Sequence, residues 1–149
     1  VDKQAMVYLT TPRAMVDEFT HIAKQCNRRA NLIPVQAFPQ RQLLHHIDVL
    51  VQGYAHNYNS PYSKTVIEAM CMGIPVVCQK QGFLADQLTD GQNCLFFEDK
   101  AEAIEKIRLL HDDTTTATAL GLNGKAWAFT QDQSVYMNQI RSLLRQLGA

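Results

Sequence analysis

The sequence lacks a long apolar run and an excess of charge of one sign. Its longest apolar stretches, such as residues 74–78, are far too short to span a bilayer. Because 14 basic and 14 acidic residues balance over 149 positions, no large field attracts nucleic acid or an anionic membrane. A hydrophobic fraction of 46% and a charged fraction of 19% are those of one soluble globular domain with a substantial core.

Disulfide and metal-binding patterns are missing as well. The four cysteines, Cys26, Cys71, Cys78 and Cys94, form no C-x-x-C pair and have no metal-ligand spacing. Each stands among apolar neighbours, where a thiol behaves as a small hydrophobe. With no visible secretory signal, this indicates a reduced, cytoplasmic setting, and attachment of a longer protein to the inner face of the cell membrane stays open. The chain opens with Val1 rather than Met, which we interpret as a trimmed start.

What the sequence does contain is an alternation of short apolar segments with stretches of helical periodicity. We expect strands over residues 5–9, 31–35, 48–52, 74–78 and 94–97. We expect helices over 13–27, 39–47, 63–72, 83–88 and from 100 onward, with breaks at 112–113 and near 130–133. The alternation and the nearly all-apolar strands predict a Rossmann-like α/β fold, in which a parallel sheet carries helices on both faces.

The longest loop that leads from a predicted strand into a helix spans residues 53–63. In parallel α/β sheets, ligands bind beyond the carboxyl ends of the strands, in loops of this kind. The loop feeds the helix over 63–72, which Gly73 should stop from a C-cap position. The end of the loop and the start of the helix are therefore the first place to expect a site.

The start of that helix has the chemistry of an anion site. Its first backbone N–H groups lack intrahelical acceptors, and with the helix dipole they favour a group such as a diphosphate. Lys64, in the first turn, adds a positive charge. Glu68 sits one turn further in and leans back toward the N-terminus, where its two oxygens suit neighbouring hydroxyls of a ribose. An anion site beside a diol site describes a nucleoside diphosphate.

A second interpretation of the same residues is structural. Thr65 and Glu68 have the spacing of a capping box, in which the glutamate satisfies the helix start and does nothing more. That box would begin the helix at Val66 and leave a very short helix before Gly73. On the residues alone, both interpretations stay open.

The helix lies within a longer stretch that resembles a known family. The segment EAMCMGIPVV at 68–77 resembles the E-A-M-x-x-G-x-P-V-V segment of retaining GT-B-fold glycosyltransferases with an E-x7-E motif, the glycosyl transferases group 1. The segments at 81–91 and 93–97 resemble the G-G-x-x-E-x-x-x-D-G segment and the N-G-L-L-V strand that follow it. Segments at 31–51 and 100–113 are also similar, so the resemblance covers roughly 5–147. Several segments in the family's order are more specific than one motif.

The resemblance implies a C-terminal, nucleotide-sugar-binding domain. In the family, the second glutamate of E-x7-E holds the nucleotide ribose, and this glutamate matches Glu68. The N-terminus of the same helix holds the diphosphate, which maps to the backbone of Tyr62, Ser63, Lys64 and Thr65. The family transfers a sugar, here expected to be a hexose, from a nucleotide donor with retention of configuration. It needs no metal or other cofactor, and this sequence contains no D-x-D pair to bind one.

One position departs from the family motif. Ser60 stands where the family has the first glutamate, which faces the donor sugar. Ser60 and its neighbour Asn59 are the expected donor-sugar contacts, and no residue is assigned as catalytic. Ser60 alternatively caps the helix ahead of Pro61. The departure supports a competing hypothesis, in which the chain is a degenerate, non-catalytic GT-B-like domain used for binding or as a scaffold.

The resemblance also implies that segments of the family precede the start of this sequence. We interpret residues 1–149 as one domain and as a fragment of a two-domain enzyme. It begins after the first strand of the C-terminal domain and after the Arg and Lys that clamp the diphosphate. The N-terminal domain, with most of the acceptor site and a catalytic histidine, is then a missing partner. We therefore expect the isolated chain to be inactive or nearly so.

Two aromatic residues near the end of the chain are predicted to be buried. Trp127 and Phe129 lie on a helical pattern together with Leu120 and Leu122. A stripe of large apolar side chains on a helix is typical of a core face. We therefore assign the two aromatic side chains to the core.

Overall fold

The computed structural model describes residues 7–11, 21, 30–34, 40–53 and 63–131. The contacts within the chain divide it into two compact units, Val1–Ile47 and Asp48–Ala149. The predicted helix over 13–27 lies outside the described residues except at residue 21, which is helical. Most of the predicted loop over 53–63 lies outside them too.

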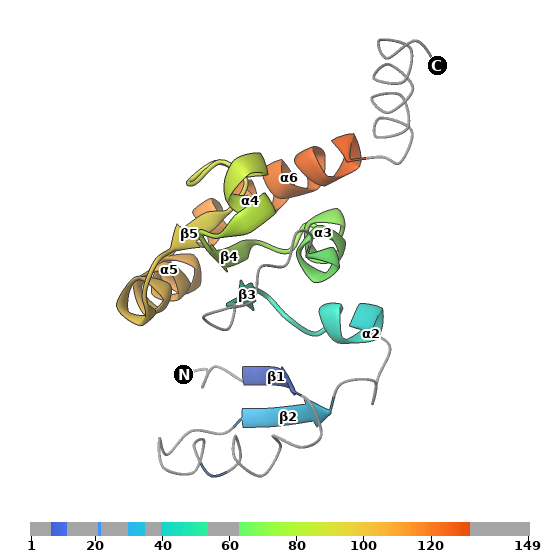
Figure 1. Ribbon diagram of the computed structural model, residues 1–149, viewed down its shortest axis with the longest axis vertical. Coiled ribbons are helices and arrows are strands. Elements are labelled where there is room, and N and C mark those ends of the chain that lie inside the picture. The colour runs from blue at the N-terminus through green and yellow to red at the C-terminus, as the bar shows by residue number, and fades with distance from the viewer. Residues whose placement is uncertain (1–6, 12–20, 22–29, 35–39, 54–62, 132–149) are drawn as a thin grey trace. The chain divides into compact units, whose positions relative to one another are not determined.

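The first unit contains a two-stranded parallel sheet (Figure 1). Strand β1 (Val7–Thr11) pairs with strand β2 (Ala30–Pro34) along its whole length. Pro34 has no N–H to donate, and it stands at the last paired position of β2, where a missing donor disturbs the ladder least. Helix α2 (Gln40–Leu44) follows and ends before residue 47, the predicted end of this helix.

The second unit is built on a three-stranded parallel sheet in the order β3-β4-β5. The strands are β3 (Leu50–Gln52), β4 (Val76–Gln79) and β5 (Leu95–Phe97). Parallel neighbours need crossover connections, and these contain α3 (Lys64–Cys71) and α4 (Gly82–Gln87). The central strand β4 is buried at its first three positions, as its apolar sequence predicts.

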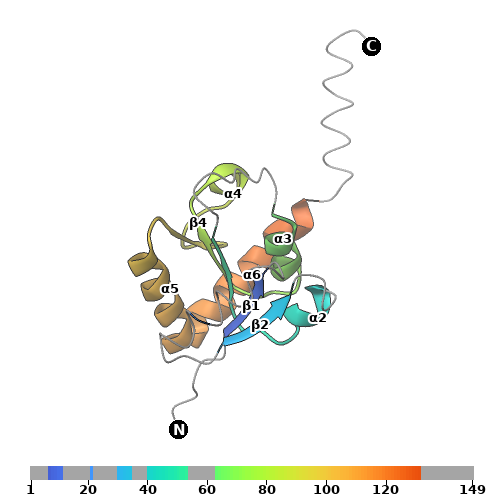
Figure 2. The same cartoon turned by 60° about the horizontal axis from the view of Figure 1, so that its bottom comes forward.

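Helices lie on both sides of this sheet. Helix α5 (Lys100–Asp112) lies on one side and α3 on the other (Figure 2), and α6 (Thr114–Thr130) packs mainly on α3. Strands β4 and β5 form a core with α5 and α6, whose buried members are Val77, Leu95, Phe97, Leu110 and Leu120. The predicted α/β fold with a parallel sheet and flanking helices is confirmed. None of the described helices is long and apolar enough to cross a membrane.

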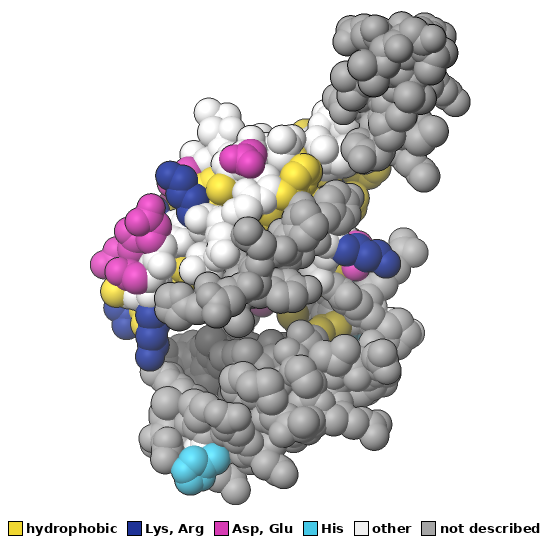
Figure 3. Space-filling model, viewed as in Figure 1, with side chains coloured by type: hydrophobic (Ala, Val, Ile, Leu, Met, Phe, Trp, Pro, Cys, Tyr) yellow, Lys and Arg dark blue, Asp and Glu magenta, His cyan; other side chains and the backbone are white. Residues whose placement is uncertain are grey.

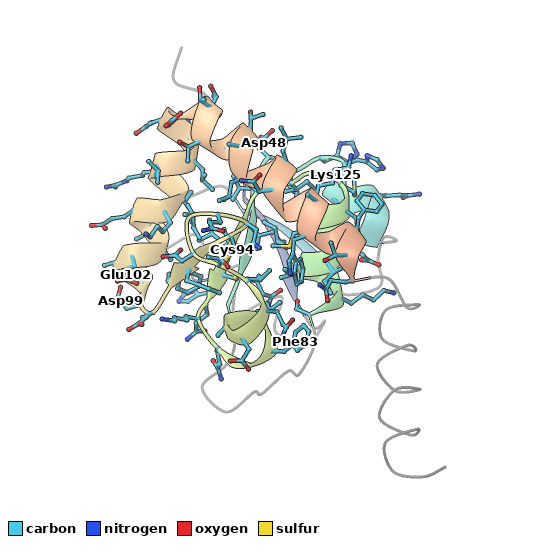
Figure 4. All side chains as sticks on the ribbon, turned by 90° about the horizontal axis from the view of Figure 1, so that it is seen from above. Asp48, Phe83, Cys94, Asp99, Glu102 and Lys125 are labelled. Atoms are coloured by element: carbon cyan, nitrogen blue, oxygen red, sulfur yellow. The ribbon has the colours of Figure 1, made fainter. Side chains whose placement is uncertain are left out.

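The two longest described helices meet at a residue that caps one and ends the other. Asp113 follows α5 and precedes α6, and its carboxylate accepts hydrogen bonds at 3.0 Å from two N–H groups in the first turn of α6. At the start of α5, Asp99 accepts a hydrogen bond from the Glu102 N–H at 2.9 Å (Figure 4). The predicted break at 112–113 is confirmed, and its cause is helix capping.

The buried face of α6 differs from the predicted one. Phe129 and Leu122 are 66% and 62% exposed, whereas Leu120 is buried and Trp127 is half-buried. The core prediction is therefore wrong for Phe129 and holds only in part for Trp127. The apolar residues of α6 are spread around its whole circumference, so their spacing in the sequence does not predict which face is buried. The face that packs inward is made mostly of small residues, Gly121, Gly124 and Ala128.

Candidate functional site

Helix α3 starts at the predicted place but without a side-chain cap. Ser63 is the N-cap residue, with an extended backbone at φ −99° and ψ 94°, and its hydroxyl makes no capping hydrogen bond. The residue is only 8% exposed, and the first turn of α3 holds no acidic side chain. A helix start of this kind favours an anion, because among the described residues neither a Ser63 side-chain cap nor a first-turn carboxylate offsets its positive end.

The capping-box alternative for Glu68 does not hold. Because α3 begins at Lys64, Thr65 is its second residue rather than its cap. The box position, three residues after the N-cap Ser63, is the buried Val66. Glu68 lies two residues beyond that position, so the capping-box interpretation is wrong.

Lys64 and Glu68 form an ion pair across the first turn of α3. The Lys64 Nζ atom lies 3.5 Å from Glu68 Oε1, and the two side chains are 79% and 33% exposed. Exposed pairs of this kind contribute about 0–1 kcal/mol, and a lysine that precedes its glutamate is in the less favourable order on a helix. The pair is weak, and a ligand that offers either side chain a better partner can rearrange it.

The far end of α3 is fixed by backbone hydrogen bonds. Gly73 adopts a φ of 77°, its N–H donates to the Met70 oxygen at 2.8 Å, and the Ile74 N–H donates to the Ala69 oxygen at 3.0 Å. These two bonds form a Schellman motif, so the predicted stop at Gly73 is confirmed. Val66, Ala69 and Met70 are buried on the inner face of α3. The helix is therefore held at its inner face and its C-terminus, while its start remains the polar end.

Helix α6 holds the turn that follows α3. A Cβ atom at Gly121 would overlap the backbone oxygen of Gly73, and one at Gly124 would stand 3.1 Å from the Asn93 oxygen. The Asn123 side chain donates a hydrogen bond to the Gln92 oxygen at 3.1 Å. Close packing of α6 therefore fixes two turns, one after α3 and one before β5.

The structure brings part of the predicted site together. The residues that it places in the first two turns of α3 or at its cap are Ser63, Lys64, Thr65 and Glu68. The predicted site residues that lie outside the described residues are Asn59, Ser60 and Tyr62. The geometry therefore bears on the expected positions of the diphosphate and the ribose, and the donor-sugar contacts stay a prediction.

A hollow of about 360 Å³ lies between α4, β5 and α5, and sequence reasoning did not single it out. Its charged lining residues are Lys80, Asp90, Glu98, Glu102 and Lys106. Figure 3 shows acidic side chains beside Lys and Arg on this part of the molecule, over α5. Two of these carboxylates accept hydrogen bonds from backbone N–H groups. Glu102 accepts from the Glu98 N–H and Asp90 accepts from the Phe96 N–H, both at 2.8 Å. No motif spacing links these residues, so the sequence carried no signal for the hollow.

Two buried cysteines are neighbours in the sheet region. Cys78 on β4 and Cys94 just before β5 are fully buried, and Cys94 is labelled in Figure 4. A hydrogen bond with Cys78, burial, and the nearby charge of Asp90 raise the pKa of Cys94. Because the thiolate is the reactive form, Cys94 stays a protonated, inert thiol at neutral pH.

The three described cysteines are free, as predicted, and Cys26 lies outside the described residues. Within the described residues, no three His, Cys, Asp or Glu side chains group as metal ligands.

Residues 14–127 match the family described as Glycosyl transferases group 1. The chain belongs to this family. The match includes the whole of α3 and extends over most of α6, and so contains the candidate site. No match is found among curated proteins.

Solved structures show the same fold as this group 1 glycosyltransferase chain. HepE from Anabaena, in complex with UDP-glucose, matches with a TM-score of 0.77 and 21% identity over 97% of this chain and 42% of HepE. The C-terminal domain of the group 1 glycosyl transferase LpcC from Francisella tularensis matches with a TM-score of 0.63 and 19% identity over 80% of this chain and 64% of that one. Sucrose-phosphate synthase from Thermosynechococcus elongatus matches with a TM-score of 0.75 and 20% identity, over 97% of this chain and 38% of the synthase.

These matches identify the fold as that of the C-terminal domain of GT-B glycosyltransferases. The predicted family and fold are therefore confirmed. The chain spans less than half the length of HepE, 42%.

Proposed function

We propose that this chain is the donor-binding domain of a retaining, metal-independent hexosyltransferase, and that it binds a nucleoside diphosphate sugar at the start of α3. The observation that carries the proposal is the uncapped start of α3 with Glu68 one turn inside it, in a chain of the group 1 family. The first turn offers N–H groups and a positive dipole end to a diphosphate. The nearby carboxylate offers two acceptor oxygens to the hydroxyls of a ribose.

Each proposed site residue has one role. The backbone of Tyr62, Ser63 and Thr65 and the ammonium group of Lys64 hold the diphosphate, and Glu68 holds the ribose. Asn59 and Ser60 contact the donor sugar. The domain would stabilise the diphosphate as it leaves, by fixed hydrogen-bond donors aimed at the developing charge.

The relatives support the class of ligand. HepE has been solved with UDP-glucose and with UDP, which are molecules of the kind that the α3 site would bind. Because the chain spans 42% of HepE, an acceptor-binding domain would complete the enzyme as its partner. The 149-residue chain alone then supplies the donor half of the cleft and is expected to transfer little or no sugar.

Glu68→Gln tests the proposal, because it keeps the size of the side chain and removes its charge. The change should weaken binding of the preferred nucleotide among UDP, GDP and ADP about tenfold or more, since hydrogen bonds to a charged group are worth about 1.5–3 kcal/mol. Isothermal titration calorimetry in buffer with a chelator measures the affinity and its independence of metal.

Glu105→Gln is the matched control, because Glu105 is an exposed glutamate on α5, far along the chain from the site. It should leave the affinity unchanged. If the unmodified chain binds none of the three nucleotides, or if Glu68→Gln binds as tightly as the unmodified chain, the proposal fails.

Ser60 favours a second candidate function, a degenerate domain that binds a donor without using it. The sugar-facing glutamate of the family motif is absent at this position. Donor binding without sugar transfer or donor hydrolysis, measured with labelled donor in a protein that also contains the acceptor-binding domain, would support this alternative. Turnover in the same assay would exclude it.

A further inference from the structure

Lys64 occupies a position that is unfavourable for α3 itself. It is the first residue of the helix, where the dipole presents its positive end, and no acidic side chain in the first turn offsets it. Helix α5 also begins with a lysine, Lys100, but there Asp99 caps the helix and Glu102 lies in the first turn. The start of α3 therefore has only the weak ion pair with Glu68 to offset its positive charge, whereas the start of α5 has a cap and a carboxylate in its first turn.

The partner of Lys64 is the carboxylate that the proposed function assigns to the ribose. Glu68 Oε1 lies 3.5 Å from Lys64 Nζ. A carboxylate that accepts hydrogen bonds from both hydroxyls of a ribose uses both of its oxygens. A carboxylate has about four lone-pair sites, so Lys64 does not block the ribose, but it shares Glu68 Oε1 with it and reduces the negative charge that the ribose hydroxyls meet.

The Lys64 ammonium group has another partner within reach once a donor is bound. Its side chain is 79% exposed, and a lysine side chain has several rotatable bonds and three hydrogen-bond donors. Helical side chains lean toward the N-terminus of their helix, where the proposed diphosphate lies. Breaking the ion pair between Lys64 and Glu68 costs little free energy, because exposed ion pairs are weak.

We propose that Lys64 exchanges partners when the donor binds, from Glu68 in the free domain to the diphosphate in the complex. The inference rests on the proposed function and adds that binding of the diphosphate promotes binding of the ribose. The diphosphate draws Lys64 away and so frees Glu68 for the ribose. Lys64 thus favours ligands that carry a diphosphate over the bare nucleoside, because the nucleoside offers the ammonium group no partner in place of Glu68.

The test is Lys64→Met, which keeps most of the side-chain length and removes the charge at an exposed position. UDP and GDP are the diphosphate probes, uridine and guanosine are the bare nucleosides, and inorganic pyrophosphate is the anion alone. We expect affinity for the preferred nucleoside diphosphate and for pyrophosphate to fall about three- to tenfold, because one charge-assisted contact is lost. Affinity for the matching nucleoside should stay the same or rise. The affinity for the nucleoside diphosphate should also depend less steeply on salt concentration.

Lys100→Met is the matched control, because it removes the corresponding lysine from a helix start that is already capped. It should change none of these affinities. Equal losses for the diphosphate and the nucleoside in Lys64→Met would overturn the inference, since they would show a structural role. An unchanged diphosphate affinity would overturn it as well.

The failure of this inference can be told apart from the failure of the proposed function. If Lys64→Met binds as the unmodified chain does while Glu68→Gln has lost affinity, the exchange is wrong and the donor site stands. If the unmodified chain binds no nucleotide, both are overturned.

Discussion

Gly121 determines how closely α6 can approach the turn after α3. A Cβ atom there would overlap the backbone oxygen of Gly73, and backbone cannot swing aside as a flexible side chain can. Gly121→Ala should therefore destabilise the chain by about 2 kcal/mol, which is typical of overpacking in a well-packed interior. Urea unfolding followed by circular dichroism measures the change.

Gly53→Ala is the matched control, because nothing lies within 4 Å of a Cβ atom built at that glycine. It should shift the free energy of unfolding by less than about 0.5 kcal/mol. Equal stabilities of the Gly121→Ala and Gly53→Ala variants would show that α6 does not pack on α3 as described.

At the residue scale, the sequence predicts some positions and not others for physical reasons. Gly73 could be predicted because a helix end with a positive φ strongly prefers glycine. The exposed side of α6 could not, because Leu122 and Phe129 are as apolar as the buried Leu120. Only the close approach of another backbone makes Gly121 and its neighbours the inward face, and that approach is a tertiary property.

At the scale of elements, the start of β4 differs from the prediction because a turn uses the backbone N–H that the strand would need. The fourth strand was predicted over 74–78, but β4 begins at Val76. The Ile74 N–H is used in the Schellman motif that ends α3, so it cannot pair in the sheet. The boundaries of α3 and of the junction between α5 and α6 are predicted more closely, because Ser63, Gly73 and the aspartates at the junction are end signals in the sequence.

The junction of α5 and α6 predicts a dependence of stability on pH. Hydrogen bonds from the Thr116 hydroxyl and backbone, and from the Thr115 N–H, hold the pKa of Asp113 below its usual range. The folded-state pKa is below the unfolded-state value, so the contribution of Asp113 to stability is fully present above the unfolded-state pKa. It is lost as the pH falls through the lowered folded-state pKa.

Asp113→Asn keeps a capping oxygen and removes the charge. We expect it to lower Tm by roughly 2–4 °C at pH 7, and the difference from the unmodified chain should shrink as the pH falls below about 4, the unfolded-state pKa of an aspartate. Thermal unfolding over this pH range measures both effects. Asp86→Asn, at an exposed residue of α4, should show no such convergence. A constant difference in Tm at all pH values would contradict the role of the Asp113 charge.

At the scale of the whole molecule, the order of the segments carried the family assignment. No single segment identifies the chain, but the match over residues 14–127 and the fold shared with HepE agree with the order of segments seen in the sequence. The donor sugar could not be predicted in the same way, because Ser60 stands where the resemblance implies a glutamate that faces the sugar. The hollow between α4 and α5 was also missed, because its lining residues come together only in the folded chain.

The most direct measurement is a nuclear magnetic resonance titration of the isotopically labelled chain with UDP-glucose, GDP-mannose and ADP-glucose. The account predicts that one of them shifts the backbone amide signals of Ser63, Lys64, Thr65 and Glu68 more than any others in the described second unit. Shifts centred on the hollow lined by Lys80 and Lys106, or no shifts with any donor, would contradict the claim that the start of α3 is the donor site.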